Sequence, residues 1–107
     1  MTENNEKILK VALIGIGGMG YCHYCCYDSI PGAKIVAVCD VREDMAKEKI
    51  LKHAGKKAGN SADTPRIYAD LDQMLANETL DMADICTPSY MHADMAVKCL
   101  EKGITEV

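Results

Sequence analysis

The chain has 107 residues, with 12 Lys and Arg against 16 Asp and Glu, giving a formal net charge of −4. This length is typical of one domain of about 100–150 residues, and 49% hydrophobic residues argue against intrinsic disorder. The mild acidity argues against nucleic-acid binding, and no apolar run approaches the ~20 residues of a membrane span. The polar, acidic residues 1–6 do not resemble a secretory signal, so we expect a soluble, cytoplasmic protein.

The six cysteines raise the question of disulfides or a metal site. Their share lies below the roughly 8–10% typical of a small disulfide scaffold. The cluster Cys22-x-x-Cys25-Cys26 beside His23 lacks the second C-x-x-C pair that would complete a tetrahedral zinc site. We therefore predict no metal, and cysteines that act as small hydrophobic residues in a reducing cytosol.

Apolar runs and helical periodicity alternate from the start of the chain. Residues 8–14 are nearly all apolar, which is typical of a parallel strand buried on both faces. After a glycine cluster, apolar residues at spacings of 3, 4 and 4 predict a helix, which Pro31-Gly32 ends. Its predicted inner stripe is Met19, Cys22, Cys26 and Ile30.

The same alternation continues to the end. Further strands are predicted over residues 33–39, 66–69, 82–86 and 104–107. Helices are predicted over residues 42–54, around 71–75 and over 90–102, with inner residues Ala46, Ile50, Ala54, Leu71, Met74, Leu75, Met91, Met95, Cys99 and Leu100. Residues 55–65, rich in Lys, Gly, Asn and Ser, are predicted to be a loop. Such alternation predicts an α/β fold, a doubly wound parallel sheet of five strands with helices on both faces.

The segment Gly15-Ile16-Gly17-Gly18-Met19-Gly20 fits the pattern G-x-G-x-x-G directly after the first strand and at the start of a helix. In this pattern Gly15 permits the tight turn, Gly17 lets the backbone approach a pyrophosphate, and Gly20 allows the helix to pack on the strand. Free N–H groups and the positive end of the helix dipole face the anion. The segment therefore predicts a dinucleotide-binding turn.

An acid follows the second strand at the spacing that this site requires. Asp40 lies 20 residues after Gly20, where its carboxylate can accept hydrogen bonds from both adenosine ribose hydroxyls. The carboxylate also repels a 2′-phosphate, which favours NAD, whereas Arg42 could accommodate that phosphate and keeps NADP open. We include Val41 between them in the predicted cofactor-binding site.

Two blocks of residues together carry a family resemblance. The first is Gly15 to Gly20 with His23, followed by Ile30-Pro31-Gly32-Ala33 and by Val36-Ala37-Val38-Cys39-Asp40. The second is Thr87-Pro88-Ser89-x-x-His92-Ala93 with Ala96, Leu100, Glu101 and Gly103. In this order the blocks resemble the start of the Gfo/Idh/MocA oxidoreductases, a family that includes glucose–fructose oxidoreductase and inositol dehydrogenase. The resemblance covers residues 7–107.

The resemblance implies a two-domain enzyme that binds NAD or NADP and moves hydride to or from a sugar, polyol or related small alcohol. It places Cys86, Thr87, Pro88 and His92 along the nicotinamide half of the cofactor, although His92 could equally cap or pack its helix. The family's Glu-Lys-Pro motif and substrate domain would follow Val107. We therefore expect one dinucleotide-binding domain here, ordered over about residues 7–107, with the substrate domain absent and no catalytic residue.

Asp84 departs from the resemblance, because family members usually have an apolar residue at this place. A buried carboxylate without a partner would be costly, so we expect Asp84 to face a solvated or hydrogen-bonded pocket. We expect His23 to pack beneath the phosphate turn and His53 to be solvated.

Two other functions stay open on the sequence alone. A methyltransferase also has a glycine-rich turn and an acid after the second strand, but it explains neither the full glycine spacing nor the Thr-Pro-x-x-x-His block. A stand-alone nucleotide-binding or interaction module without catalysis would fit the chain's length. Without a second domain, apolar faces and an unpaired edge strand would be exposed, so we predict self-association, most simply as a symmetric dimer.

Overall fold

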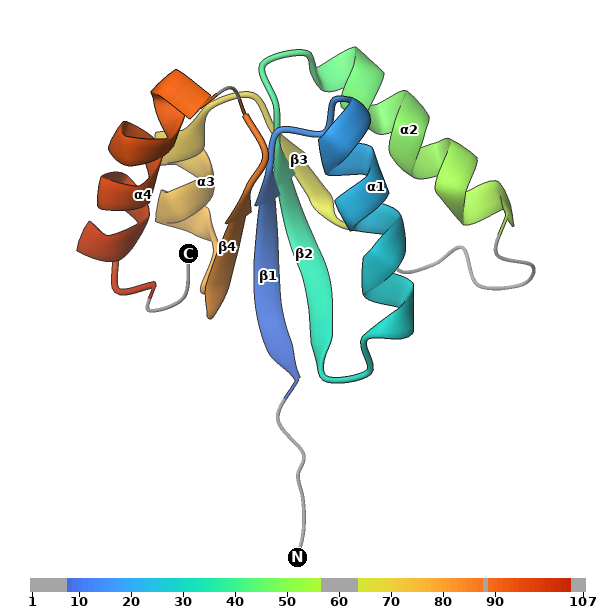
Figure 1. Cartoon of the computed structure of the whole chain (residues 1–107), viewed down its shortest axis with the longest axis horizontal. Helices are drawn as coiled ribbons and strands as arrows, with labels where there is room; N and C mark the ends of the chain where they lie inside the picture. Colours follow the sequence, from blue (N-terminus) through green and yellow to red (C-terminus); the bar gives the residue numbers. More distant parts are fainter. Residues whose placement is uncertain (1–7, 57–63, 88, 105–107) are drawn as a thin grey trace, which may run out of the picture.

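The computed structural model of the chain describes residues 8–56, 64–87 and 89–104. It has a parallel sheet with two helices on each face (Figure 1). The strands are β1 (Leu9–Ile14), β2 (Ala33–Cys39), β3 (Arg66–Tyr68) and β4 (Met82–Ile85), in the order β3-β2-β1-β4. On one face lie α1 (Gly18–Cys26) and α2 (Glu43–Lys56), and on the other α3 (Leu71–Asn77) and α4 (His92–Glu101). Two short 3₁₀ turns are η2 (Tyr27–Ser29) and η3 (Ser89–Met91).

The predicted α/β doubly wound class is confirmed, with a different strand count. The described part of the chain contributes four strands rather than five, because Ile104 follows α4 outside any strand and residues 105–107 lie outside the described residues. The chain runs outward through β1, β2 and β3 and then returns to the other side of β1, where β4 pairs with it. Such a reversal leaves a crevice at the carboxyl ends of the first and fourth strands, where open α/β sheets bind ligands.

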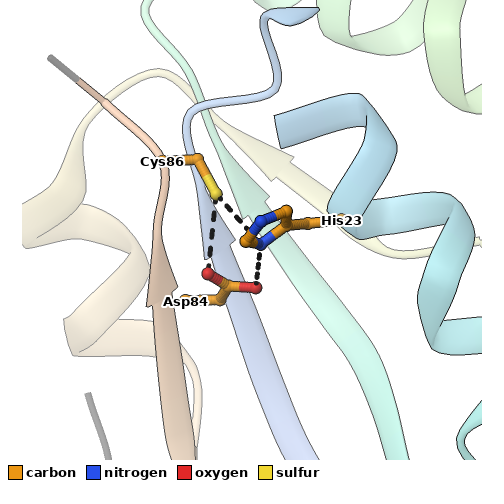
Figure 2. A group of neighbouring side chains, drawn as sticks. All are labelled: His23, Asp84 and Cys86. Atoms are coloured by element: carbon orange, nitrogen blue, oxygen red, sulfur yellow. Dashed lines mark hydrogen bonds and ion pairs between the residues drawn. The ribbon is translucent and has the colours of Figure 1, made fainter. Parts of the chain in front are cut away.

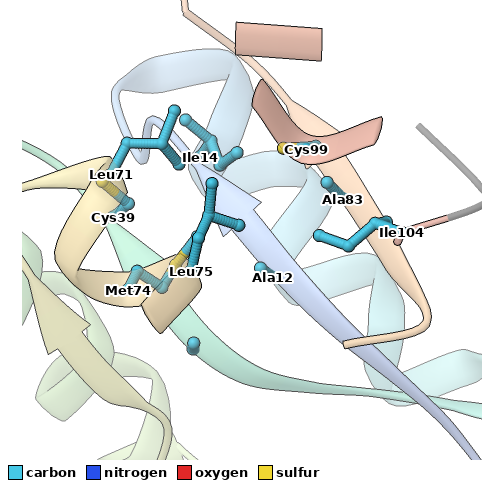
Figure 3. Packing of buried hydrophobic residues seen from close by; sticks show 10 residues of the cluster. Ala12, Ile14, Cys39, Leu71, Met74, Leu75, Ala83, Cys99 and Ile104 are labelled. Carbon is cyan, nitrogen blue, oxygen red and sulfur yellow. The ribbon is translucent and has the colours of Figure 1, made fainter. Parts of the chain in front are cut away.

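The core consists of two layers, one on each face of the sheet. Successive residues of β1 alternate between them, as the period of two in a strand requires. Val11 and Leu13 pack in the cluster on the α1 and α2 side, whereas Ala12 and Ile14 pack in the cluster on the α3 and α4 side. Figure 3 shows the second cluster, in which Leu71, Met74 and Leu75 of α3 meet the sheet. The predicted inner residues of α3 are therefore confirmed.

The inner face of α1 differs from the predicted one. All four residues of the predicted stripe are exposed or half-exposed at the surface: Met19, Cys22, Cys26 and Ile30. Instead Gly20 is buried against the turn, and Tyr24 and Tyr27, which follow it on the same helical face, pack against the core. The prediction was wrong because the position of Gly20 fixes the rotation of the helix, and apolar spacing alone did not include it.

Two smaller corrections concern helices α2 and α4. Helix α2 extends to Lys56, two residues into the segment predicted as a loop, and residues 57–63 lie outside the described part. Its Ala46 and Ile50 are buried as expected. In α4, Cys99 is fully buried but Leu100 is 54% exposed, because consecutive helical residues are rotated by about 100°.

None of the described helices is long and apolar enough to cross a bilayer.

The close contact between Gly20 and the turn at Gly15 generates the first prediction. A Cβ added at Gly20 would lie 2.0 Å from the carbonyl oxygen of Gly15 and 2.8 Å from its carbonyl carbon, both backbone atoms. We expect Gly20→Ala to lower the free energy of unfolding by about 2–3 kcal/mol, measured by urea denaturation. The control is Gly32→Ala, where an added Cβ meets nothing within 4 Å. Equal stability of the two variants would contradict the close-packing role of Gly20.

Candidate functional site

The candidate site begins at the turn between β1 and α1. Gly15 has a φ of +92°, a conformation that other residues rarely adopt, and its N–H donates to the Cys39 carbonyl at 2.7 Å. A Cβ at Gly15 would also come within 2.9 Å of the Thr87 side chain. At Gly17, by contrast, an added Cβ would meet nothing within 4 Å. The turn therefore needs glycine at position 15 for its fold, while position 17 opens to the outside.

Asp40 at the end of β2 holds this turn with its side chain. One carboxylate oxygen, Oδ2, accepts a hydrogen bond from the N–H of Ile16 at 3.0 Å, and Oδ1 accepts from the N–H of Arg42 at 2.9 Å. The backbone N–H of Asp40 donates to the Tyr68 carbonyl of β3 at 2.9 Å. Each carboxylate oxygen has two lone pairs, so the group can still accept hydrogen bonds from a ligand hydroxyl.

A cavity of about 530 Å³ opens at the carboxyl ends of all four strands. Seven of the predicted cofactor-binding residues line it: Gly15, Gly17, Asp40, Val41, Arg42, Cys86 and Thr87. These residues come from the ends of β1, β2 and β4, so the structure brings together the glycine turn, the acid and the block after the fourth strand. The cavity coincides with the crevice that the strand order creates.

The other predicted site residues lie elsewhere. Ile16 is fully buried and takes part only through its backbone N–H, and Gly20 is buried behind the turn. Gly18 and Met19 are exposed at the start of α1 without lining the cavity. The Nε2 atom of His92 lies within hydrogen-bond distance of the Thr87 carbonyl. Pro88 lies outside the described residues.

The sequence interpretation missed one wall of the cavity. This wall follows β3 and includes Ala69, Asp70 and Leu71, while methionines complete the lining: Met45, Met91 and Met95. Asp70 also caps α3 by accepting a hydrogen bond from the Gln73 N–H at 3.2 Å. The sequence could have predicted this wall. The strands of a parallel sheet have their carboxyl ends at the same edge, and the third strand was predicted to end near residue 69.

A second group of polar side chains lies between α1 and β4 (Figure 2). Asp84 Oδ2 accepts hydrogen bonds from His23 Nδ1 at 2.9 Å and from the Tyr27 hydroxyl at 3.2 Å. The expectation that Asp84 faces a hydrogen-bonded pocket is therefore confirmed. His23 does not simply pack beneath the turn but bonds to Asp84 of β4.

Cys86 joins this group from the end of β4. Its Sγ lies 3.4 Å from His23 Nδ1 and 3.5 Å from Asp84 Oδ1. Burial, followed by the charge of Asp84 and the hydrogen bond to it, raises the pKa of the Cys86 thiol to about 12. Burial and Asp84 also raise the pKa of the Tyr27 hydroxyl. In this arrangement both groups are protonated donors at neutral pH.

The expectation that His53 is solvated was wrong. Its side chain is 13% exposed, and its Nε2 lies 2.6 Å from Asp28 Oδ2. Its Nδ1 lies 3.6 Å from Cys25 Sγ. The ring of Tyr24 packs edge-on against the imidazole ring, with the two ring centroids 5.2 Å apart. The histidine is enclosed because side chains of α1 and η2 reach α2 at this point, a contact that no local pattern indicates.

A glycine turn at the start of a helix, an acid at the end of the second strand and a cavity between them define a nucleotide-binding Rossmann domain. Residues 9–107 match the family model GFO_IDH_MocA, described as an oxidoreductase family with an NAD-binding Rossmann fold. The chain belongs to this family.

Curated relatives of several kinds are similar to the chain. D-apiose dehydrogenase of Paraburkholderia graminis is 33% identical over 106 residues, which cover 99% of this chain and 26% of the relative. The 4-carboxy-2-hydroxymuconate-6-semialdehyde dehydrogenase of Sphingobium is 30% identical, covering 89% of this chain and 27% of the relative. An alpha-N-acetylgalactosaminidase of Tannerella forsythia is 32% identical, covering 96% and 22%. The chain thus spans about a quarter of the length of these relatives.

A solved structure shows the same fold. Scyllo-inositol dehydrogenase from Lactobacillus casei, solved with NAD(H) and scyllo-inositol, superposes with a TM-score of 0.77 at 21% identity. The match covers 94% of this chain and 27% of that one.

The contacts of Asp40 generate the second prediction. Asp40→Ala would leave the fully buried N–H of Ile16 without its hydrogen-bond partner. We expect this substitution to lower the free energy of unfolding by about 1–3 kcal/mol in the absence of any ligand, measured by urea denaturation. Glu48→Ala removes an exposed acid from the middle of α2 and is the matched control, with an expected change near zero. A loss no larger than that of the control would contradict the role of Asp40 in holding the turn.

Proposed function

We propose that this chain is the NAD-binding part of an oxidoreductase that moves hydride between a nicotinamide cofactor and a sugar, polyol or related small alcohol. The observation that carries the proposal is the cavity in which the open glycine turn and the Asp40 carboxylate meet. The D-apiose dehydrogenase relative supports the substrate class. When bound, NAD supplies the hydride acceptor, and the residues of this chain bind and orient it.

The start of α1 is suited to the pyrophosphate. Gly17 is the N-cap of the helix and offers no side chain to occupy the first N–H groups, and the first turn contains no acid. The helix dipole and free N–H groups therefore favour an anion at this point. The open space at Gly17 lets the phosphates approach the backbone.

The ribose end of the cofactor would lie against Asp40. Its carboxylate is held by the backbone N–H groups of Ile16 and Arg42, so it keeps its place when a ligand enters. A 2′-phosphate would meet this fixed negative charge, whereas two ribose hydroxyls would donate to it. The guanidinium of Arg42, the group that could accept a 2′-phosphate, donates instead to the Met45 sulfur at 2.8 Å. Because the fixed charge of Asp40 opposes that phosphate, we propose NAD as the preferred cofactor, with NADP bound more weakly.

A hydrolase is the second candidate function. It is favoured by the alpha-N-acetylgalactosaminidase relative, whose identity to this chain matches that of the dehydrogenases. A protein that extends this chain by a substrate-binding part would separate the two. Formation of NADH with polyols or aldoses supports the oxidoreductase, and release of sugar without net NADH formation supports the hydrolase.

The cysteines bear on where the protein works and on its partners. All six cysteines are free thiols, which supports a location in the reducing cytoplasm, and neither nucleic acid nor a membrane is a proposed partner.

Helix α4 exposes Val97 and Leu100 by more than half, and such apolar surface favours association. We expect the purified chain to sediment as a dimer, and a monomer across the micromolar range would contradict this.

Position 17 gives the sharpest test of cofactor binding. Gly17 has a φ of −64°, which alanine adopts, and an added Cβ meets no protein atom within 4 Å. We therefore expect Gly17→Ala to fold normally and to bind NAD at least tenfold more weakly, because the methyl group fills the space of the pyrophosphate.

Isothermal titration of NAD and NADP into the wild type, Gly17→Ala and the control Gly32→Ala measures this. The wild type and the control should bind NAD alike and NADP at least tenfold more weakly. Equal NAD affinity of all three proteins, or no binding by the wild type, would contradict the proposal.

A further inference from the structure

The group formed by His23, Asp84 and Cys86 is not used by the proposed cofactor site, apart from the position of Cys86 at the cavity edge. The three residues come from α1, from β4 and from the residue after β4, and their potential ligand atoms all lie within 4.8 Å of one another. Figure 2 shows the three side chains turned toward one common point. Among the described residues, this is the group whose His, Cys and acidic side chains could share a metal ion.

Two of the distances in the group are close to those around a tetrahedral ion. With metal–ligand bonds of about 2.0–2.3 Å, neighbouring ligand atoms in a zinc site lie about 3.3–3.6 Å apart. In this group Sγ of Cys86 lies 3.4 Å from Nδ1 of His23 and 3.5 Å from Oδ1 of Asp84. Nδ1 of His23 lies 2.9 Å from the other carboxylate oxygen, Oδ2, so binding needs a small separation of this pair and a turn of the Asp84 carboxylate that brings one oxygen to the ion.

Charge and access also suit a divalent cation. A thiolate and a carboxylate together neutralise two positive charges, and the neutral imidazole adds a third ligand without charge. The Asp84 side chain is 16% exposed, while that of His23 is 44% exposed and leaves a path from solvent. An imidazole, a carboxylate and a thiolate are ligands that zinc and its neighbours in the first transition row accept together.

We propose that His23, Asp84 and Cys86 form a binding site for a zinc-type divalent cation that ties α1 to the end of β4. The ion has three protein ligands, and its fourth position takes a solvent molecule or the hydroxyl of Tyr27, which already lies 3.2 Å from Asp84 Oδ2. On binding, the thiol proton of Cys86 is released to solvent, and the His23 proton moves from Nδ1, where it is donated to Asp84, to Nε2, so that the freed Nδ1 binds the ion. The site does not depend on NAD binding.

Cobalt(II) provides the direct probe, because a thiolate–cobalt bond gives a near-ultraviolet charge-transfer band. We expect the chelator-treated chain to bind one Co²⁺ with this band, and Zn²⁺ to displace it. In Cys86→Ser, which changes one atom, the band should disappear and the Zn²⁺ affinity should fall at least tenfold. Asp84→Asn should retain the band with at least tenfold weaker affinity, and circular dichroism checks that both variants are folded.

The matched control addresses the two exposed thiols of α1. Cys22 and Cys26 are exposed on this helix and take no part in the proposed site. The double variant Cys22→Ser/Cys26→Ser should therefore keep both the band and the Zn²⁺ affinity of the wild type. The proposal is overturned if the wild type shows no band, if the band survives in Cys86→Ser, or if it disappears in the double variant, which would place the metal on the helix thiols instead.

Discussion

The pair of backbone hydrogen bonds that the Asp40 carboxylate accepts is the interaction on which the rest of the site depends. The turn after β1 contains the left-handed Gly15 and the fully buried Ile16, whose N–H would otherwise lack a partner. By accepting a hydrogen bond from that N–H, the carboxylate links the ends of β1 and β2 and is itself held in position at the cavity. One side chain thus stabilises the turn and faces the proposed ribose position, so an Asp40 variant alters both at once, whereas Gly17→Ala tests binding at the turn without removing either hydrogen bond of Asp40.

The elements that the sequence predicted well are those with a strong local pattern. The strand over residues 33–39 has the predicted bounds, and the inner faces of α2 and α3 contain the predicted residues that the structure describes. The glycine turn and Asp40 were also predicted, because their spacing follows from the geometry of a βαβ unit. In each case the information lies within a few residues, or within one strand–helix–strand repeat.

What the sequence did not predict depends on contacts between distant segments. His23 and Asp84 are 61 residues apart, and their bond requires a particular pairing of β1 with β4, in which Leu13 lies opposite Asp84. A shift of that pairing by one residue would turn Asp84 to the other face of the sheet. The rotation of α1 is similar, because the contact of Gly20 with Gly15 sets it while the apolar spacing suggested another face.

The turn between β1 and α1 is therefore stabilised by contacts from three elements before any ligand binds. Asp40 fixes it from β2, Gly20 packs against it from α1, and Cys86 borders it from β4 while donating its backbone N–H to the Ile14 carbonyl at 2.8 Å. A site that is already ordered loses little conformational entropy on binding, so more of the contact energy appears as affinity. Because Cys86 also belongs to the group with His23 and Asp84, an ion bound there would fix the third of these supports, and the turn would become rigid on both of its sides.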